Sequence, residues 1–109
     1  MSEECVYRQG DVLLTEARLP EGEVREIARD SNDKLVLAYG EVTGHHHFIA
    51  EPDAKLVQVI NGDRYLRVDA PVFMRHEEHA PIPLQPGIFR VVIQREYVPG
   101  PVQYREVAD

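Results

Sequence analysis

The 109-residue chain is 43% hydrophobic and 28% charged, which is typical of one soluble globular domain over residues 1–109 and excludes a disordered chain. Nineteen acidic residues against twelve basic ones give a formal net charge of −7, and the basic residues are scattered singly, which excludes the basic stripe that nucleic-acid binding needs. No apolar run approaches the roughly 20 residues that span a bilayer, and the acidic start does not resemble a signal peptide, so we expect a cytoplasmic protein with no nucleic-acid and no membrane partner.

Short apolar runs rich in valine, separated by Gly and Pro, predict an all-β domain. Residues 23–30 are ambiguous between one helical turn and an extended edge, and the prolines of 80–87 predict a loop or an edge because proline cannot donate to a central ladder. In chain order, strands are expected at 9–15, 34–42, 44–51, 54–60, 64–68, 72–76 and 88–97, with an edge strand near the C-terminus.

Asn61-Gly62 between two alternating apolar runs predicts a tight hairpin, because both residues tolerate the positive φ of such turns. Seven or eight short strands with regularly spaced turns predict a small β-barrel or sandwich. Exposed strand edges in such a fold also favour a homo-oligomer.

The five histidines fall in two short groups, GHHHFIAE at 44–51 and RHEEH at 75–79. Side chains of a strand alternate between its faces, so His45, His47 and Glu51 share one face. We expect the other face, with Phe48 and Ala50, to belong to the core or to a packed second layer. An H-x-H pair on one strand places two imidazoles side by side, which suits a shared metal ion.

His76 and His79 point to opposite sides on a regular strand but converge on a turn or bulge. With His45, His47 and Glu51 they are the candidate ligands of a divalent transition metal: zinc, iron, manganese or nickel. His46, Glu77 and Glu78 are candidates for the supporting groups that orient the ligands.

Two other readings of the histidines remain open. They can be ordinary surface or core residues, or they can form a pH switch, since an imidazole titrates near neutral pH. The concentration of all five in two groups favours the metal.

Other catalytic arrangements are absent from the sequence. Ser2 and Ser31 lie in expected loops without the context of a catalytic serine, and the single cysteine, Cys5, lies away from the histidines and excludes an internal disulfide. Adjacent carboxylates point apart on a strand, so no acid–base pair is assigned, and no catalytic residue is named.

The stretch from Gly40 through His45, His47 and Glu51 resembles the first motif of the cupin family of small β-barrels, which runs glycine, spacer, H-x-H, spacer, glutamate. The resemblance implies a cupin-like barrel with those three residues as metal ligands. The chain departs from the family where Gln58 replaces the closing glycine and Arg90 stands at the position of the last histidine.

Over nearly the whole chain, QGDVLL, GEVTGHHH, HEEHAPI and RVVIQREY are similar to a group of small uncharacterised proteins of bacteria and their phages. That similarity implies a phage or other larger assembly as a partner. We therefore predict a metal-binding β domain with a structural or accessory role. The alternative is a cupin-like metalloenzyme acting on a small molecule by hydrolysis, isomerisation or oxygen chemistry, so whether the protein is an enzyme stays open.

Overall fold

A computed structural model describes residues 5–40, 44–60, 62–94, 96–97 and 104–105, and within them it contains strands and no helix. The all-β prediction is confirmed. The strands are β1 Cys5–Gln9, β2 Val12–Glu16, β3 Val24–Ile27, β4 Leu35–Tyr39, β5 His46–Ile49, β6 Ala54–Val59, β7 Arg64–Val68, β8 Val72–Met74, β9 Ile82–Leu84, β10 Gly87–Ile93, β11 Glu96–Tyr97 and β12 Tyr104–Arg105.

Six strands form one antiparallel sheet in the order β1-β2-β10-β7-β6-β3. β10 lies between β2 and β7, so the longest strand of the described residues, with seven residues, is in the interior of the sheet. β1 and β3 are the two ends of the strand order, and the pairings of the described residues do not close this sheet into a barrel.

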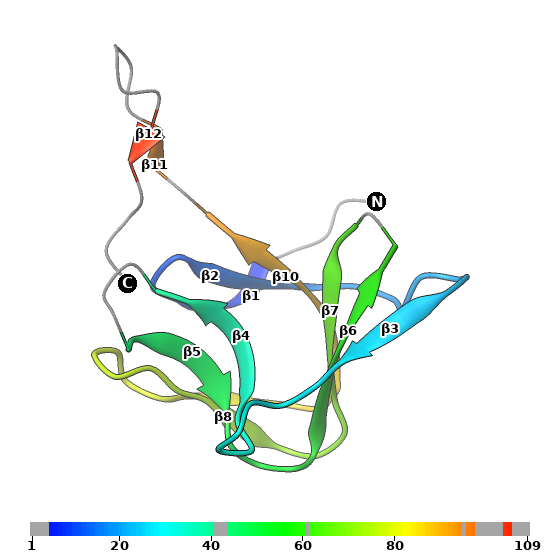
Figure 1. Ribbon diagram of the computed structural model, residues 1–109, viewed down its shortest axis with the longest axis horizontal. Coiled ribbons are helices and arrows are strands. Elements are labelled where there is room, and N and C mark those ends of the chain that lie inside the picture. Colours follow the sequence, from blue (N-terminus) through cyan, green and yellow to red (C-terminus); the bar gives the residue numbers. More distant parts are fainter. Residues whose placement is uncertain (1–4, 41–43, 61, 95, 98–103, 106–109) are drawn as a thin grey trace.

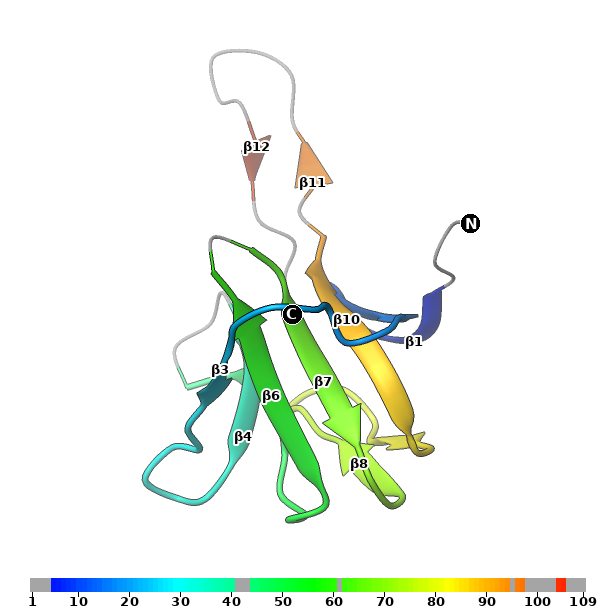
Figure 2. The ribbon, with the colours of Figure 1, turned by 90° about the vertical axis from the view of Figure 1, so that its right-hand side faces the viewer.

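The remaining pairs, β4-β5 and β8-β9, form a second layer (Figure 1). A single bridge between Phe48 and Arg75 joins β5 to the end of β8, with mutual backbone hydrogen bonds of 2.9 and 2.8 Å. In Figure 2, β4 and β8 lie behind β6 and β7. The short hairpin β11-β12 extends away from both layers in both views.

One apolar core fills the space between the two layers. The large sheet contributes side chains such as Leu14, Leu56 and Leu66, and the second layer contributes Leu37 and Met74, all of them fully buried. Buried and exposed positions alternate along β8 and over the first three residues of β6, which follows the period of two that a strand imposes.

Several predicted boundaries are wrong at the turns. The stretch 9–15 is not one strand, because Gly10, with a φ of 57°, turns the chain between β1 and β2; glycine adopts this left-handed conformation without a Cβ clash. The strand predicted over 88–97 stops at Ile93 and resumes as β11. Residues 23–30 contain the extended edge strand β3.

Other boundaries agree with the predictions. The hairpin of β6 and β7 forms as expected, although Asn61 lies outside the described residues, as do residues 41–43 of the strand predicted at 34–42. Pro83 lies in β9, which pairs with β8 alone and is therefore an edge.

Arg29 joins three segments of the fold through its guanidinium group. It donates to the carbonyl oxygens of Asp33, Ile49, Glu51 and Ala54 at 2.7–3.4 Å. These carbonyls belong to the turn before β4, the end of β5 and its following loop, and the start of β6. The planar fork of arginine suits such convergent acceptors.

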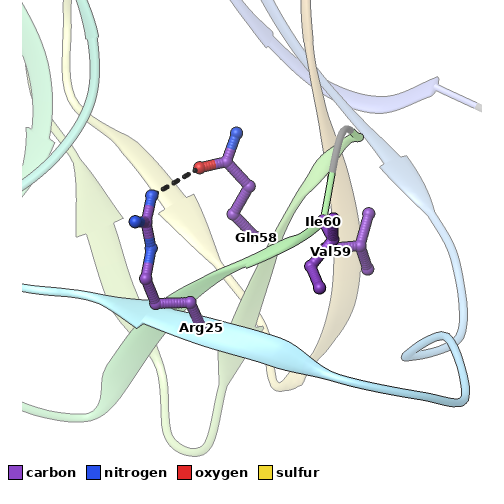
Figure 3. Close-up of a pocket in the computed structure, with 4 residues that line it drawn as sticks. All are labelled: Arg25, Gln58, Val59 and Ile60. Carbon is purple, nitrogen blue, oxygen red and sulfur yellow. Dashed lines mark hydrogen bonds between the residues drawn. The ribbon is translucent and has the colours of Figure 1, made fainter.

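Two further features concern the surface. No helix of the described residues is long and apolar enough to cross a membrane. A hollow on β3 and β6 is lined by Arg25, Gln58, Val59 and Ile60, and Arg25 donates a 3.3 Å hydrogen bond to Gln58 across it (Figure 3). These strands carry none of the histidines.

Leu66→Ala tests the position of the core. Leu66 is fully buried and is paired with Leu56 on one side and Phe89 on the other. Truncation leaves a cavity, so we expect a loss of about 2–5 kcal/mol in the free energy of unfolding, measured by chemical denaturation. Ile60→Ala, at a side chain that is 68% exposed, should change it by less than about 0.5 kcal/mol. Equal effects would contradict the assigned core.

Candidate metal centre

Four of the five histidines gather into one cluster, which we call the histidine cluster: His45, His47, His76 and His79. His47 lies on β5, and His45 directly precedes that strand. His76 and His79 follow β8, where the chain leaves the ladder in a bend. Because the bridge of Phe48 to Arg75 holds β5 beside the end of β8, the two histidine groups meet although about 30 residues separate them.

The ring positions show how closely the cluster is packed. The ring centroid of His76 lies 4.4 Å from that of His47, 4.6 Å from that of His79 and 5.5 Å from that of His45. The His47 and His79 centroids are 6.0 Å apart. His47, His76 and His79 thus form a triangle, and His45 lies against His76 outside it.

β5 presents its histidine face to the interior. His47 is 0% exposed and Ile49 is equally buried, whereas Phe48 is half-buried and Ala50 exposed. Of the two places expected for Phe48 and Ala50, the core is therefore not the one they occupy, and Phe48 instead lies half-buried against the ring of His46. Ile49 fills the space between the layers. Because His47 lies on the same side of the strand, its ring also points inward.

The turn between β1 and β2 borders the cluster and was missed by the sequence reasoning. Gln9 and Asp11 are 3% and 4% exposed. Gln9 Oε1 lies 2.9 Å from His47 Nδ1, and Asp11 Oδ1 lies 3.4 Å from His47 Nε2. The only signal in the sequence was the polar pair Gln9 and Asp11 on either side of Gly10, and this pattern is typical of an ordinary turn.

Gly10 lets this turn approach the rings. A Cβ atom on Gly10 would lie 2.8 Å from His79 Nε2 and 3.3 Å from His47 Cε1. A Cβ contact below 3.0 Å essentially never occurs, so only glycine fits here without displacing His79. His79 Nε2 is buried without a hydrogen-bond partner among the described residues.

His46 lies outside the cluster. Its ring stacks on Phe48, with 4.7 Å between the centroids, and more distantly on Tyr39. Its Nδ1 lies 3.1 Å from the carbonyl oxygen of Gly44 and 3.0 Å from the carboxylate of Glu77. His46 therefore packs on the outer side of β5. The partners of its Nδ1 atom are Gly44 and Glu77, neither of which belongs to the histidine cluster.

Glu77 and Glu78 contact different histidines. Glu77 accepts a 2.8 Å hydrogen bond from the backbone N–H of His46. Desolvation raises the pKa of Glu77, but this hydrogen bond, one from its own backbone and the charges of His46 and His76 together lower that pKa below its usual range. Glu78 places its carboxylate 3.6 Å from His45 Nδ1, and its backbone N–H donates to His76 Nδ1 at 2.9 Å.

Glu51 turns toward a cation. Its Oε2 lies 3.6 Å from the guanidinium of Arg75, and its Oε1 is buried without a hydrogen-bond partner among the described residues. The sequence pattern places Glu51 and His47 on one face of the strand. In the structure, however, Glu51 forms an ion pair with Arg75 at the end of β5.

The donor atoms of the cluster are not arranged as a finished metal site. Among the described residues, no three His, Cys, Asp or Glu side chains hold their donor atoms in positions suited to one ion. The hydrogen bond from Glu78 to His76 Nδ1 uses a lone pair of that ring. A neutral His76 therefore carries its proton on Nε2, and coordination through Nε2 requires this bond to break and the proton to leave.

Two of the ring separations themselves fit a shared ion. An imidazole bound at about 2.1 Å has its ring centre about 3.2 Å from the metal. Two such rings at 90–110° to each other then have centres about 4.5–5.3 Å apart. The separations of His76 from His47 and from His79 lie close to that range, whereas the 6.0 Å between His47 and His79 exceeds it, so these side chains would have to move before the three rings could share one ion.

Gly10→Ala tests the close approach of the turn to the rings. Alanine adds left-handed strain of about 1–2 kcal/mol and also collides with His79. We expect a lower melting temperature and shifted NMR signals of the His47 and His79 rings. Gly22→Ala, at a φ of 105° with open space around it, should lower stability without moving those signals. Unmoved ring signals in Gly10→Ala would contradict the described packing.

Comparison with known proteins identifies the chain at the level of a family. No curated protein and no solved structure matches it. Residues 8–94 match a family described as a domain of unknown function, DUF8820. This match covers the β1–β2 turn, both histidine groups and the central strand β10. The chain belongs to the DUF8820 family of domains of unknown function.

Proposed function

We propose that the protein binds one divalent transition metal ion at the histidine cluster, and that the ion has a structural or accessory role. The observation that carries the proposal is the triangle of His47, His76 and His79, with centroid separations of 4.4, 4.6 and 6.0 Å. Zinc, iron, manganese and nickel all accept imidazole ligands.

Burial supports the proposal. His47 is 0% exposed and His76 is 7% exposed, so an ion held between these rings would be shielded from water. His79 Nε2 is buried without a hydrogen-bond partner among the described residues, and it faces the turn at Gly10. A metal ion would use these nitrogens as ligands.

The structural role follows from which segments the ligands come from. His47 belongs to β5 and His76 and His79 to the bend after β8, while the β1–β2 turn of the large sheet covers them. Metal binding here would link β5 to the bend after β8, beneath the turn of the large sheet. Because a metal that binds only the folded state adds its binding free energy to stability, such a link stabilises a small domain.

The cupin-like metalloenzyme remains the alternative proposal. It requires a ligand position open to a small molecule and a barrel that encloses it. The hollow on β3 and β6 contains no cluster histidine, so it is not the small-molecule site that this alternative requires.

Metal addition should stabilise the fold. At a free metal concentration 100 times the Kd, the free energy of unfolding should rise by about 2.7 kcal/mol, which corresponds to roughly 10–20 °C in the melting temperature of a domain of this size. The measurement is a thermal melt of chelator-treated, untagged protein with added Zn²⁺, Co²⁺, Ni²⁺ or Mn²⁺. No shift with any of the four would overturn the proposal.

Two histidine variants locate the effect. His76→Gln with His79→Gln should abolish the metal-dependent shift, because both rings belong to the triangle. His46→Gln is the matched control, since its ring stacks on Phe48 outside the cluster, and it should keep the full shift. A double variant that retains the shift, or a control that loses it, would place the metal elsewhere.

A further inference from the structure

The side-chain amide of Gln9 has one orientation that satisfies all of its neighbours. Its Nε2 lies 2.9 Å from the carbonyl oxygen of Met74 and 3.0 Å from that of Ala80. Both partners are acceptors only, so this end of the amide must be the NH₂ group, which has two hydrogens to donate. Gln9 Oε1 is then the atom that faces His47 Nδ1 at 2.9 Å.

This orientation decides which nitrogen of His47 carries a proton. Because Gln9 Oε1 can only accept, His47 Nδ1 must donate a hydrogen to it. In a neutral imidazole the other nitrogen, Nε2, then holds a lone pair. Fixing one ring nitrogen with an outer hydrogen bond is how proteins present the other nitrogen to a metal.

Asp11 is the group that faces this lone pair. Its Oδ1 lies 3.4 Å from His47 Nε2, and both residues are buried, at 4% and 0% exposure. Two lone-pair atoms at this distance in a buried place repel each other unless a cation lies between them.

The separation helps to distinguish the two cations that fit, a proton and a metal ion. A charge-assisted hydrogen bond between nitrogen and a carboxylate is usually about 2.7–2.9 Å long. Two ligands of a tetrahedral ion with bonds of about 2.0–2.1 Å are about 3.3–3.4 Å apart. The observed 3.4 Å matches the second case.

We infer that Asp11 is a ligand of the proposed metal ion, beside His47, and that Gln9 is the positioning residue that holds His47 in the correct tautomer. The inference rests on the proposed function. It replaces Glu51 by Asp11 as the carboxylate of the site, since Glu51 Oε2 is directed at Arg75. A carboxylate among imidazoles favours zinc, iron(II), manganese or nickel and disfavours copper(I), which prefers sulfur ligands.

The first experiment compares two carboxylate variants in Co²⁺ titrations of chelator-treated protein. Asp11→Asn should weaken Co²⁺ binding by more than about 100-fold, because a direct ligand should cost at least as much as the 10–100-fold typical of an outer partner. Glu51→Gln, the matched control, should change it less than about threefold. Melting temperatures in chelator verify that both variants fold.

Gln9→Leu isolates the positioning role. It removes the hydrogen bond to His47, together with those to the carbonyl oxygens of Met74 and Ala80, without removing a ligand. Provided that a melt in chelator shows the variant to be folded, binding should weaken by about 10–100-fold while the visible spectrum of bound Co²⁺ keeps the intensity of the wild type. A binding constant unchanged in Gln9→Leu would overturn the positioning role.

A cysteine substitution gives a readout that a merely structural role of Asp11 would not produce. In a Cys5→Ser background, Asp11→Cys would place a thiolate on the metal, and Co²⁺ should then give a sulfur-to-cobalt charge-transfer band in the near ultraviolet. Asp63→Cys, on an exposed residue of the β6–β7 loop, should give none.

The outcomes separate the inference from the proposed function. If the wild type binds none of the added metals, both are overturned. If the wild type binds Co²⁺ while Asp11→Asn binds equally well and Asp11→Cys shows no band, the histidine site stands and Asp11 is not a ligand. Loss of binding in Glu51→Gln alone would restore Glu51 as the carboxylate.

Discussion

The side chain of Gln9 is the contact on which the arrangement of the candidate site depends. One buried amide holds the carbonyl oxygens of Met74 and Ala80, which lie on either side of the second histidine group, and it also holds the ring of His47. It thereby fixes β5 and the bend after β8 against the end of β1. Without it, two carbonyl oxygens and the Nδ1 atom of His47 would each lose a hydrogen bond inside the protein, which is costly for each group.

This contact explains why the histidines gather at the junction of the two layers. β8 and β9 form only a short pair, and β5 reaches β8 through a single bridge, so the second layer has few ladder hydrogen bonds of its own. Polar contacts from the β1–β2 turn compensate for this at the end of the layer. A metal ion at the same place would act in the same direction, because it would add ligand bonds between the segments that the ladder joins least.

The sequence predicted the fold class and most strands because their signals are local. Alternation and the Asn-Gly turn locate β6 and β7, and the apolar residues on both sides of Arg90 locate β10. The break at Gly10 was missed because a single glycine in an apolar run does not by itself distinguish a turn from a strand. The sequence left the core face of β5 undecided because phenylalanine is usually more buried than histidine, which favoured Phe48, whereas in the structure Ile49 determines the direction.

The candidate site was only partly accessible to sequence reasoning. Spacing alone puts His45 and His47 on one face, but the approach of His76 and His79 depends on the bridge between Phe48 and Arg75, which no local pattern encodes. Asp11 is further still from both groups in sequence, and it reaches His47 only because the β1–β2 turn folds over the second layer. The direction of Glu51 toward Arg75 was equally invisible.

Elemental analysis of untagged protein, purified without a metal-affinity column, tests the central claim most directly. The account predicts about one transition metal ion per chain, since the ligands of the site come from one copy of the chain. A ratio near one half or one third would place the ion on a symmetry axis between copies and contradict a site within one chain. Protein that contains no metal and takes none up on addition would contradict the account as a whole.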